Sequence, residues 1–271
     1  MKERPIIFNS EMVRAILEKR KTQTRRIIKP RKPFLTQCKW YGPHPNGGWW
    51  GVDIPDGITP SQYGILAGDG MGFPCPYGVP GDRLWVRETW IPDPPQDGSW
   101  DYEVFTDGKV FNFDALPKSY KNPKHVIYKS SWGDIGFKWH PSIHMPRWAS
   151  RITIEITDVR VQRVQEISEE DAIAEGIEYL FSKEDCLTVA GLIGSKQEDH
   201  GYKNYLWHGD FGSYGGGNKQ SDSWPYQYSG YKSARDSYSS LWEKINAKRG
   251  YGWDINPWVW CLSFRVLEIQ S

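Results

Sequence analysis

A basic segment at residues 19–26 constrains this chain more than any other part of its sequence. It holds five cations and two threonines, with no carboxylate among them. The apolar run at residues 5–8 predicts a short strand before it, and Asn9 and Ser10 are residue types that begin helices. Apolar side chains then recur at helical spacing, at Met12, Val13, Ile16 and Leu17. The pattern predicts a strand, a helix and a basic loop that faces an anion or a nucleic acid.

Length, charge and aromatic content limit what the chain can be. Its 271 residues are enough for one large domain, which we place at residues 1–271. The formal net charge is +1, so a nucleic-acid contact would come from a local patch and not from a field over the whole molecule. The 15 Trp and 15 Tyr indicate either a stacking surface or long loops pinned by buried rings, and the second outcome is the commoner one.

The cysteines and the apolar runs bear on compartment and cofactors. Four cysteines are widely spaced and include no CxxC pair: Cys38, Cys75, Cys186 and Cys261. This spacing argues against a disulfide framework or a zinc site, so we expect no metal and no cofactor. The apolar run near the N-terminus is too short for a signal peptide, and nothing approaches a membrane span. We therefore expect a cytoplasmic protein with no membrane partner.

Two strands are predicted in the middle of the chain. Residues 84–90 alternate so that one face carries Leu84, Val86 and Glu88. The carboxylate that ends this face is either a rim residue paired with a cation or a functional group. Residues 152–157 alternate strictly, and they predict a strand with a buried face of Ile152, Ile154 and Ile156.

Helices are predicted on both sides of a second irregular region. Ser168 and Asp171 match a capping box before a helix at residues 169–175, which Gly176 should end. A second helix is expected at residues 233–248, with one apolar side made by Ala234, Tyr238, Leu241, Trp242 and Ile245.

The remaining sequence predicts one last strand and three insertions. The strand is expected at residues 258–266. Insertions of little periodicity are expected at about residues 31–78, 91–140 and 178–232. Within the second insertion, residues 102–105 and 126–129 carry weak strand signals. The order of the elements predicts an α+β core interrupted by long irregular segments.

The ordered segments resemble the ASCH-domain family of the PUA-like superfamily. Residues 20–26 match the family's G-x-K-T-x-T-x-R motif, except that Lys19 stands where the family has Gly. Residues 80–88 resemble its G-D-x-L-x-V-x-E strand, and residues 152–176 resemble its strand, valine-rich connector and short helix. The resemblance covers less than half of the chain. The long aromatic insertions resemble those of bacteriophage and prophage members, which implies a bacterial host cell.

The resemblance implies a fold and a group of activities. The fold would be a curved, mostly antiparallel β-barrel with flanking helices and a cleft. Members of the superfamily bind RNA or modified nucleotides, and one small bacterial branch hydrolyses N4-acetylcytidine to cytidine and acetate. Its catalytic groups fall here on Lys21, Thr24 and Glu175.

General chemistry allows two roles for these three residues. In amide hydrolysis, Thr24 attacks or positions a water, Lys21 acts as base if its pKa is depressed, and Glu175 holds Lys21 or moves a proton. In the alternative, Lys21 and Thr24 bind a phosphate, and Glu175 balances the basic segment as a structural ion pair. The sequence leaves both roles open.

A binding module is the other main hypothesis. Its contacts with RNA, DNA or a modified nucleoside would come from Arg20, Thr22, Arg25, Arg26, Glu88, Arg147, Trp148, Arg151, Asn256 and Trp258. Arginines would contact phosphates, and the tryptophans and Asn256 would stack on and read a base. Packing and loop anchoring are the competing roles for the aromatic residues. A third reading is a phage assembly protein that binds partners through its aromatic loops, and the sequence predicts no oligomeric state.

Overall fold

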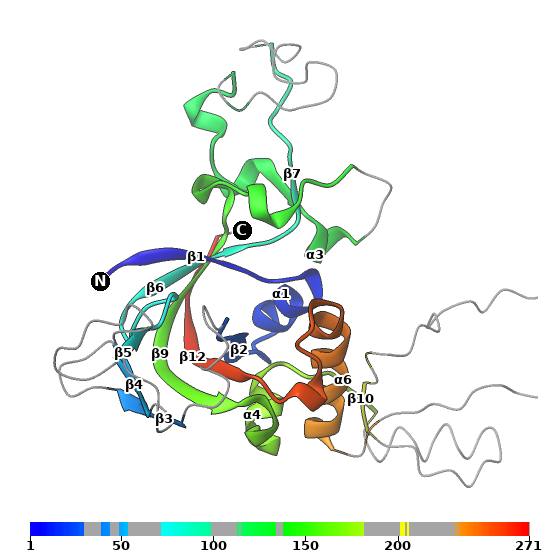
Figure 1. The fold of residues 1–271 in the computed structure, drawn as a ribbon. Coiled ribbons are helices and arrows are strands. Elements are labelled where there is room, and N and C mark those ends of the chain that lie inside the picture. Colours follow the sequence, from blue (N-terminus) through cyan, green and yellow to red (C-terminus); the bar gives the residue numbers. More distant parts are fainter. Residues whose placement is uncertain are drawn as a thin grey trace, which may run out of the picture.

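The computed structural model describes residues 1–29, 39–43, 49–53, 72–98, 113, 115–133, 138–181, 201–203, 205, 231 and 233–270. Its centre is a sheet with the strand order β1 (Glu3–Ile7), β6 (Arg83–Arg87), β9 (Ile152–Arg163), β12 (Trp258–Ile269) and β2 (Gln23–Ile27). The β1–β6 pair is parallel, and the other pairs are antiparallel. Helices α1 (Ser10–Leu17), α4 (Glu169–Ala174) and α6 (Ala234–Asn246) pack around this sheet (Figure 1). The predicted α+β class is confirmed.

Strand β12 separates two hydrophobic cores because successive side chains of a strand point to opposite faces. Trp260, Leu262 and Phe264 enter a first core that also receives α1 and the inner faces of β6 and β9. Val259 and Cys261 enter a second core, which α4 and α6 cover. The chain therefore buries both faces of its last strand. The predicted apolar sides of the strands at 84–90 and 152–157 and of the last helix are confirmed, although β6 ends at Arg87, before the predicted end at residue 90.

The resemblance predicts a curved β-barrel, and the residues that the structure describes do not close into one. The five-stranded sheet is open, with β1 and β2 as its two edges. The connection between these edges is α1, whose Val13 and Ile16 pack into the first core. The guanidinium of Arg26 also spans the opening, because its Nη2 donates to the carbonyl of Ile7 at 2.6 Å. The same guanidinium lies 4.9 Å from the ring centroid of Phe8.

The basic segment is not the loop that its composition predicts. Residues 23–27 form β2, which pairs with β12 so that Thr24 lies opposite Leu262 and Arg25 opposite Cys261. Lys21, before the strand, is almost fully buried, as are Thr24 and Arg25. The strand forms because carboxylates elsewhere in the chain pair with these cations. No local sequence pattern predicts this pairing.

Helix α1 ends on a residue in an unfavourable conformation. Lys19 has φ +61°, in the left-handed region. The N–H of Arg20 donates to the carbonyl of Ala15 at 2.8 Å, and that of Lys19 to Ile16 at 3.0 Å. These two bonds make a Schellman motif, and Lys19 occupies the position that normally carries glycine. At the other end, Asn9 caps the helix by accepting from the N–H of Met12 at 2.8 Å, as its residue type predicts.

Replacing Lys19 by glycine should stabilise the protein. Glycine adopts positive φ without the clash of a β-carbon, so Lys19→Gly should raise the free energy of unfolding by about 1 kcal/mol. Urea unfolding of the purified protein would measure the change. Lys19→Ala keeps the β-carbon and serves as the control, with little change expected. A loss of stability in Lys19→Gly would contradict the assignment of strain to this residue.

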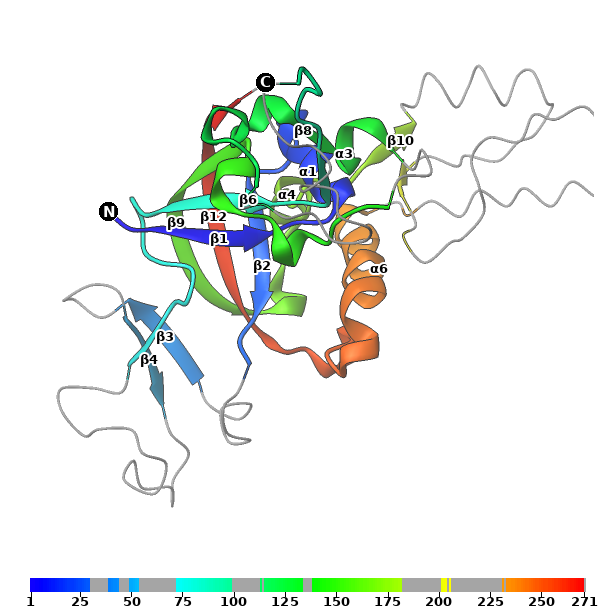
Figure 2. The ribbon, with the colours of Figure 1, turned by 90° about the horizontal axis from the view of Figure 1, so that it is seen from above.

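The predicted insertions carry small structures of their own. In the first, β3 (Lys39–Pro43), β4 (Trp49–Asp53) and β5 (Gly72–Pro74) form a separate sheet, with β3 and β4 on the side of the main sheet opposite α6 (Figure 2). In the second, β7 (Trp90–Pro92) pairs with β8 (Val126–Tyr128), and α3 (Lys129–Trp132) follows. In the third, β10 (Tyr179–Phe181) pairs with β11 (Gly201–Tyr202). The strand signal at 126–129 is confirmed, and the one at 102–105 lies outside the described residues.

Short 3-10 turns complete the described part of the chain. They are η3 (Lys118–Tyr120), η4 (Pro123–His125), η5 (Ser142–His144), η6 (Arg147–Ala149), η7 (Val164–Glu166), η8 (Ala247–Arg249) and η9 (Trp253–Ile255).

Candidate functional site

A buried ion pair between Lys21 and Glu175 joins the start of β2 to the end of α4. The ammonium Nζ of Lys21 donates to Oε2 of Glu175 at 2.6 Å and to the carbonyl of Glu175 at 2.7 Å. The side chains are 0% and 2% exposed. The two residues also form an isolated β-bridge, and the N–H of Thr22 donates to the carbonyl of Ala174 at 2.8 Å. Backbone pairing therefore fixes the distance at which the two charged groups meet.

Burial changes the acidity of Lys21. Loss of water around the ammonium is the largest effect, and it lowers the pKa of Lys21 from its ordinary value of 10.5. Attraction to Glu175 opposes this shift, whereas repulsion from Arg26 and Arg25 adds to it. The net direction is downward, so Lys21 releases its proton more readily than a lysine in water. A lysine of this kind can act as a general base.

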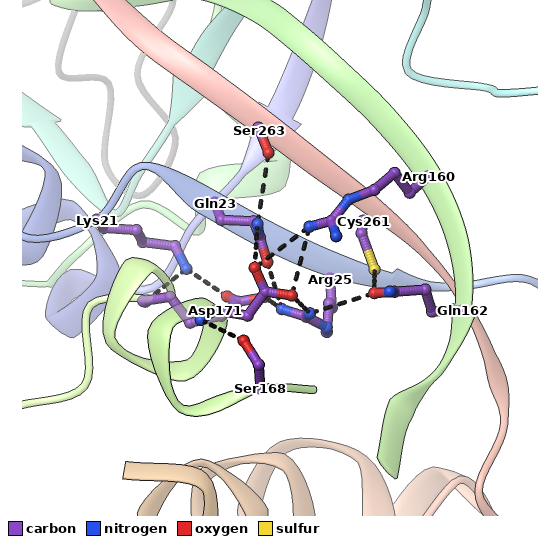
Figure 3. A network of polar contacts seen from close by, with 10 residues as sticks. Lys21, Gln23, Arg25, Arg160, Gln162, Ser168, Asp171, Cys261 and Ser263 are labelled. Atoms are coloured by element: carbon purple, nitrogen blue, oxygen red, sulfur yellow. Dashed lines mark hydrogen bonds and ion pairs between the residues drawn. The ribbon is translucent and has the colours of Figure 1, made fainter. Parts of the chain in front are cut away.

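Arg25 links this pair to a second carboxylate. Its Nη1 lies 3.4 Å from Oε1 of Glu175, and its Nη2 lies 2.6 Å from Oδ2 of Asp171 (Figure 3). Asp171 also accepts from Gln23 at 3.0 Å and from Arg160 at 3.2 Å. We call these six residues the Arg25 network: Lys21, Gln23, Arg25, Arg160, Asp171 and Glu175. It is a chain of alternating charges in which every carboxylate contacts at least two donors.

Asp171 does not have the role that the sequence predicts for it. Ser168 caps α4 by accepting from the N–H of Asp171 at 3.1 Å, which is half of the predicted capping box. The carboxylate of Asp171 instead enters the Arg25 network. Partial burial would raise the pKa of Asp171, but hydrogen bonds and charges of Gln23, Arg25 and Arg160 outweigh it and hold that pKa below its usual range.

Asp171, Gln23 and Arg160 belong to the site, although the sequence did not indicate them as site residues. The signal present in the sequence is an uncompensated excess of cations at residues 19–26, which requires carboxylates from elsewhere if the segment is buried. The position of those carboxylates has no local signature, because Arg25 and Asp171 are 146 residues apart in the chain.

Thr24 lies on the opposite face of β2 from Arg25. It is buried, faces the first core beside Leu262, and shares its face with Arg26. Among the described residues, no side-chain hydrogen bond joins it to Lys21 or Glu175. The ammonium of Lys21 lies between the two faces, since it contacts Glu175 and lies 5.8 Å from the ring centroid of Phe8. The structure thus joins Lys21 and Glu175 directly, and Thr24 lies three residues along the chain without a side-chain hydrogen bond to either of them in the described residues.

Glu88 belongs to a different cluster. Its carboxylate accepts from Nε of Arg151 at 3.0 Å, from Nη2 of Arg151 at 3.2 Å and from the hydroxyl of Ser130. The guanidinium of Arg151 lies 3.9 Å from the ring centroid of Tyr128. Glu175, and not Glu88, is therefore the carboxylate in contact with Lys21. Glu88, one of the residues predicted to contact a nucleic acid, instead pairs with Arg151 of the same chain.

Other predicted contact residues have partners within the protein. Arg147 pairs with Glu3 at 2.9 Å, and Trp148 packs edge-on against Trp90. Arg20 binds Glu18 and the carbonyl of Gly176. In the last loop, the side chain of Asn256 accepts from the N–H of Gln165, and the ring of Trp258 lies under the guanidinium of Arg163. Loop anchoring and packing describe these contacts.

A shallow cavity of about 120 Å³ lies beside the end of α4. Of the predicted site residues, Arg20 and Glu175 line it, together with Glu11, Tyr205 and other residues of α1, α6 and the neighbouring segments. The cavity reaches Glu175 from the side of α1. Its rim carries both signs of charge, so it is not a simple anion site.

Comparison of the chain with protein-family models, with curated proteins and with solved structures finds no match. Within the described ranges, no group of three or more His, Cys, Asp or Glu side chains could hold a metal ion. None of the described helices has the length and apolar character needed to cross a membrane. The geometry around Lys21 is therefore the main guide to function.

Proposed function

We propose that this chain hydrolyses an acyl amide on a nucleobase, of the kind found in N4-acetylcytidine, with Lys21 as the acid–base group. The observation that carries the proposal is the fully buried Lys21 ammonium, which lies 2.6 Å from Glu175. Burial lowers the pKa of Lys21. Ionisable groups with pKa values shifted by burial and a specific charged partner cluster at functional sites. The resemblance of residues 20–26 to the ASCH motif supplies the substrate class.

The proposed reaction uses one water molecule and no cofactor. Neutral Lys21 takes a proton from the Thr24 hydroxyl, or from a water that Thr24 holds, and the oxygen attacks the acyl carbon. The C–N bond then breaks, and the ammonium of Lys21 gives its proton to the departing nitrogen of cytosine. Where Thr24 carries the acyl group as an ester, a water activated by Lys21 releases acetate and restores the hydroxyl. Glu175 stabilises the ammonium form of Lys21 between the two proton transfers.

The pairing of the arginines favours this proposal over a phosphate-binding module. Arg25, Arg147 and Arg151 each form an ion pair with a carboxylate of the same chain. A phosphate on Arg25 or Arg151 would have to displace a carboxylate, and the buried charge of Glu175 or Glu88 left behind would oppose binding. The pair between Arg147 and Glu3 is about 40% exposed and opposes binding only weakly. Of the arginines predicted to contact phosphates, Arg25 and Arg151 are therefore engaged with buried or partly buried carboxylates of the same chain.

The direct test is the release of cytidine and acetate from N4-acetylcytidine, with both products measured by chromatography. We expect turnover by the wild type and a loss of about 100-fold or more in kcat for Lys21→Met and for Thr24→Ala. Arg265→Gln is the control, because Arg265 is largely exposed and pairs with Glu155, and neither residue belongs to the Arg25 network. Circular dichroism should confirm that all variants are folded. No turnover by the wild type, or full activity of Lys21→Met, would contradict the proposal.

A further inference from the structure

The carboxylate of Glu175 is shared between two buried cations. Lys21 holds Oε2 at 2.6 Å, and Nη1 of Arg25 approaches Oε1 at 3.4 Å. The side chains of Lys21 and Arg25 are both 0% exposed. One carboxylate thus has a strong contact with the lysine and a second, longer contact with the arginine.

The second contact matters when Lys21 loses its proton. If Lys21 were the sole partner, deprotonation would leave Glu175 charged, buried and unpaired, and this cost would keep the proton on the lysine. A guanidinium does not lose its proton in proteins. Arg25 therefore remains a cationic partner for Glu175 after Lys21 becomes neutral.

We infer that Arg25 is a positioning residue that frees Lys21 to act as a base, by keeping Glu175 paired and in place while the lysine is neutral. The inference rests on the proposed function, because it concerns the same lysine. Asp171 anchors the other end of the guanidinium at 2.6 Å and so fixes where Arg25 meets Glu175. The position of Arg25 is variable in the motif that the segment resembles, so this role is a property of the present chain.

The groups that face Lys21 and Arg25 come from several elements. Glu175 and Asp171 belong to the α4 region, Arg26 to β2, Tyr238 to α6 and Cys261 to β12. Burial raises the pKa of Tyr238 well above 10 and that of Cys261 to about 12. Both groups are therefore neutral below pH 10, and arginine stays charged. Of the groups facing the pair, Lys21 is the one whose loss of a proton governs the rate on the acid side.

The test compares two variants whose effects have opposite signs. In Arg25→Gln, the repulsion that lowers the pKa of Lys21 disappears, so the acid limb of the pH–rate profile should move up by about one pH unit, with an about tenfold loss at a fixed pH on that limb. In Asp171→Asn, the charge of Arg25 is less compensated, so the limb should move down. Arg25→Lys keeps the charge and should restore part of the wild-type profile.

A purely structural role predicts a different result. Loss of packing or stability would lower the rate in both variants without moving the limb, or would move it in the same direction in both. Either result, in folded protein, would overturn the inference. Arg265→Gln should leave the limb unchanged, because Arg265 lies outside the Arg25 network.

A measurement on the resting protein separates this inference from the proposed reaction. In protein labelled with 13C-lysine, the Cε signal of Lys21 is assigned by its absence in Lys21→Met and followed against pH. We expect it to titrate below 10.5 in the wild type, higher in Arg25→Gln and lower in Asp171→Asn. Titration as expected with no turnover would reject the reaction and keep the electrostatic coupling. A wild-type Lys21 that keeps its proton up to pH 10.5 would overturn the inference even if Arg25→Gln does not fold.

Discussion

Glu175→Gln should lower the free energy of unfolding by about 3 to 5 kcal/mol at neutral pH. The substitution keeps the size of the side chain and removes its charge, which leaves the ammonium of Lys21 buried without a counter-ion. Lys21→Met should cost less, because Glu175 then keeps Arg25 as a partner. Urea unfolding followed by far-UV circular dichroism would measure both changes.

Two further proteins make the test specific. The double variant Lys21→Met/Glu175→Gln removes both charges and should recover most of the loss caused by Glu175→Gln. Glu155→Gln breaks an ion pair whose arginine, Arg265, is 65% exposed, and it should cost only about 0 to 1 kcal/mol. If Glu175→Gln cost as little as Glu155→Gln, the buried ion pair between Lys21 and Glu175 would not stabilise the fold as we predict.

The cost of Glu175→Gln should also depend on pH. Burial lowers the pKa of Lys21 in the folded state below its ordinary value of 10.5. Between these two pKa values the unfolded chain binds more protons, so the contribution of Lys21 to stability rises with pH. That contribution is complete above 10.5 and is lost as the pH falls through the folded-state value. The deficit of Glu175→Gln should therefore shrink towards pH 10.5, where Lys21 is neutral in both proteins.

Gly176→Ala should be about as damaging, for a steric reason. Gly176 follows Glu175 with φ +83°, and a β-carbon there would lie 2.9 Å from the Cβ atoms of Ala15 and Lys21. The left-handed conformation costs about 1 to 2 kcal/mol for a residue with a β-carbon. Overpacking adds about 1 to 3 kcal/mol, so a total of about 2 to 4 kcal/mol is expected in urea unfolding.

Gly250 provides the matched control for Gly176. It has φ +79°, and a β-carbon there would have no atom within 4 Å. Gly250→Ala should therefore show the conformational cost alone, and the difference between the two variants measures the close approach of α4 to α1 and Lys21. Equal effects of the two substitutions would mean that the contact at Gly176 relaxes without cost. Because Gly176→Ala also displaces Glu175, it should reduce turnover of N4-acetylcytidine, whereas Gly250→Ala should not.

The elements with regular apolar patterns could be predicted from the sequence. The strands β6, β9 and β12 and the helix α6 lie where alternation or helical spacing places them, because each buries one consistent set of apolar side chains. Strand β2 could not be predicted in this way. Its inward side chains are charged or polar, and its burial depends on partners that the local sequence does not contain.

The site was predictable only in part, for the same reason. The motif resemblance indicated Lys21 and Glu175, and the structure brings these two into contact. Asp171 looked like a capping residue because its spacing from Ser168 fits that role. In the structure its carboxylate instead pairs with Arg25. The sequence left Glu88 as either a rim residue paired with a cation or a functional group, and it indicated Arg151 as a phosphate contact. In the fold they pair with each other, which explains why neither needs an outside partner.

The contact between Lys21 and Glu175 joins residues 154 positions apart, and β2 is held in the sheet by β12, the last strand of the described chain. Closing so long a loop costs chain entropy before the contact returns any free energy. During synthesis from the N-terminus, the segment that becomes β2 therefore remains without its sheet neighbour until β12 has left the ribosome. The lowered pKa of Lys21 therefore depends on contacts with residues that are synthesised long after Lys21 itself.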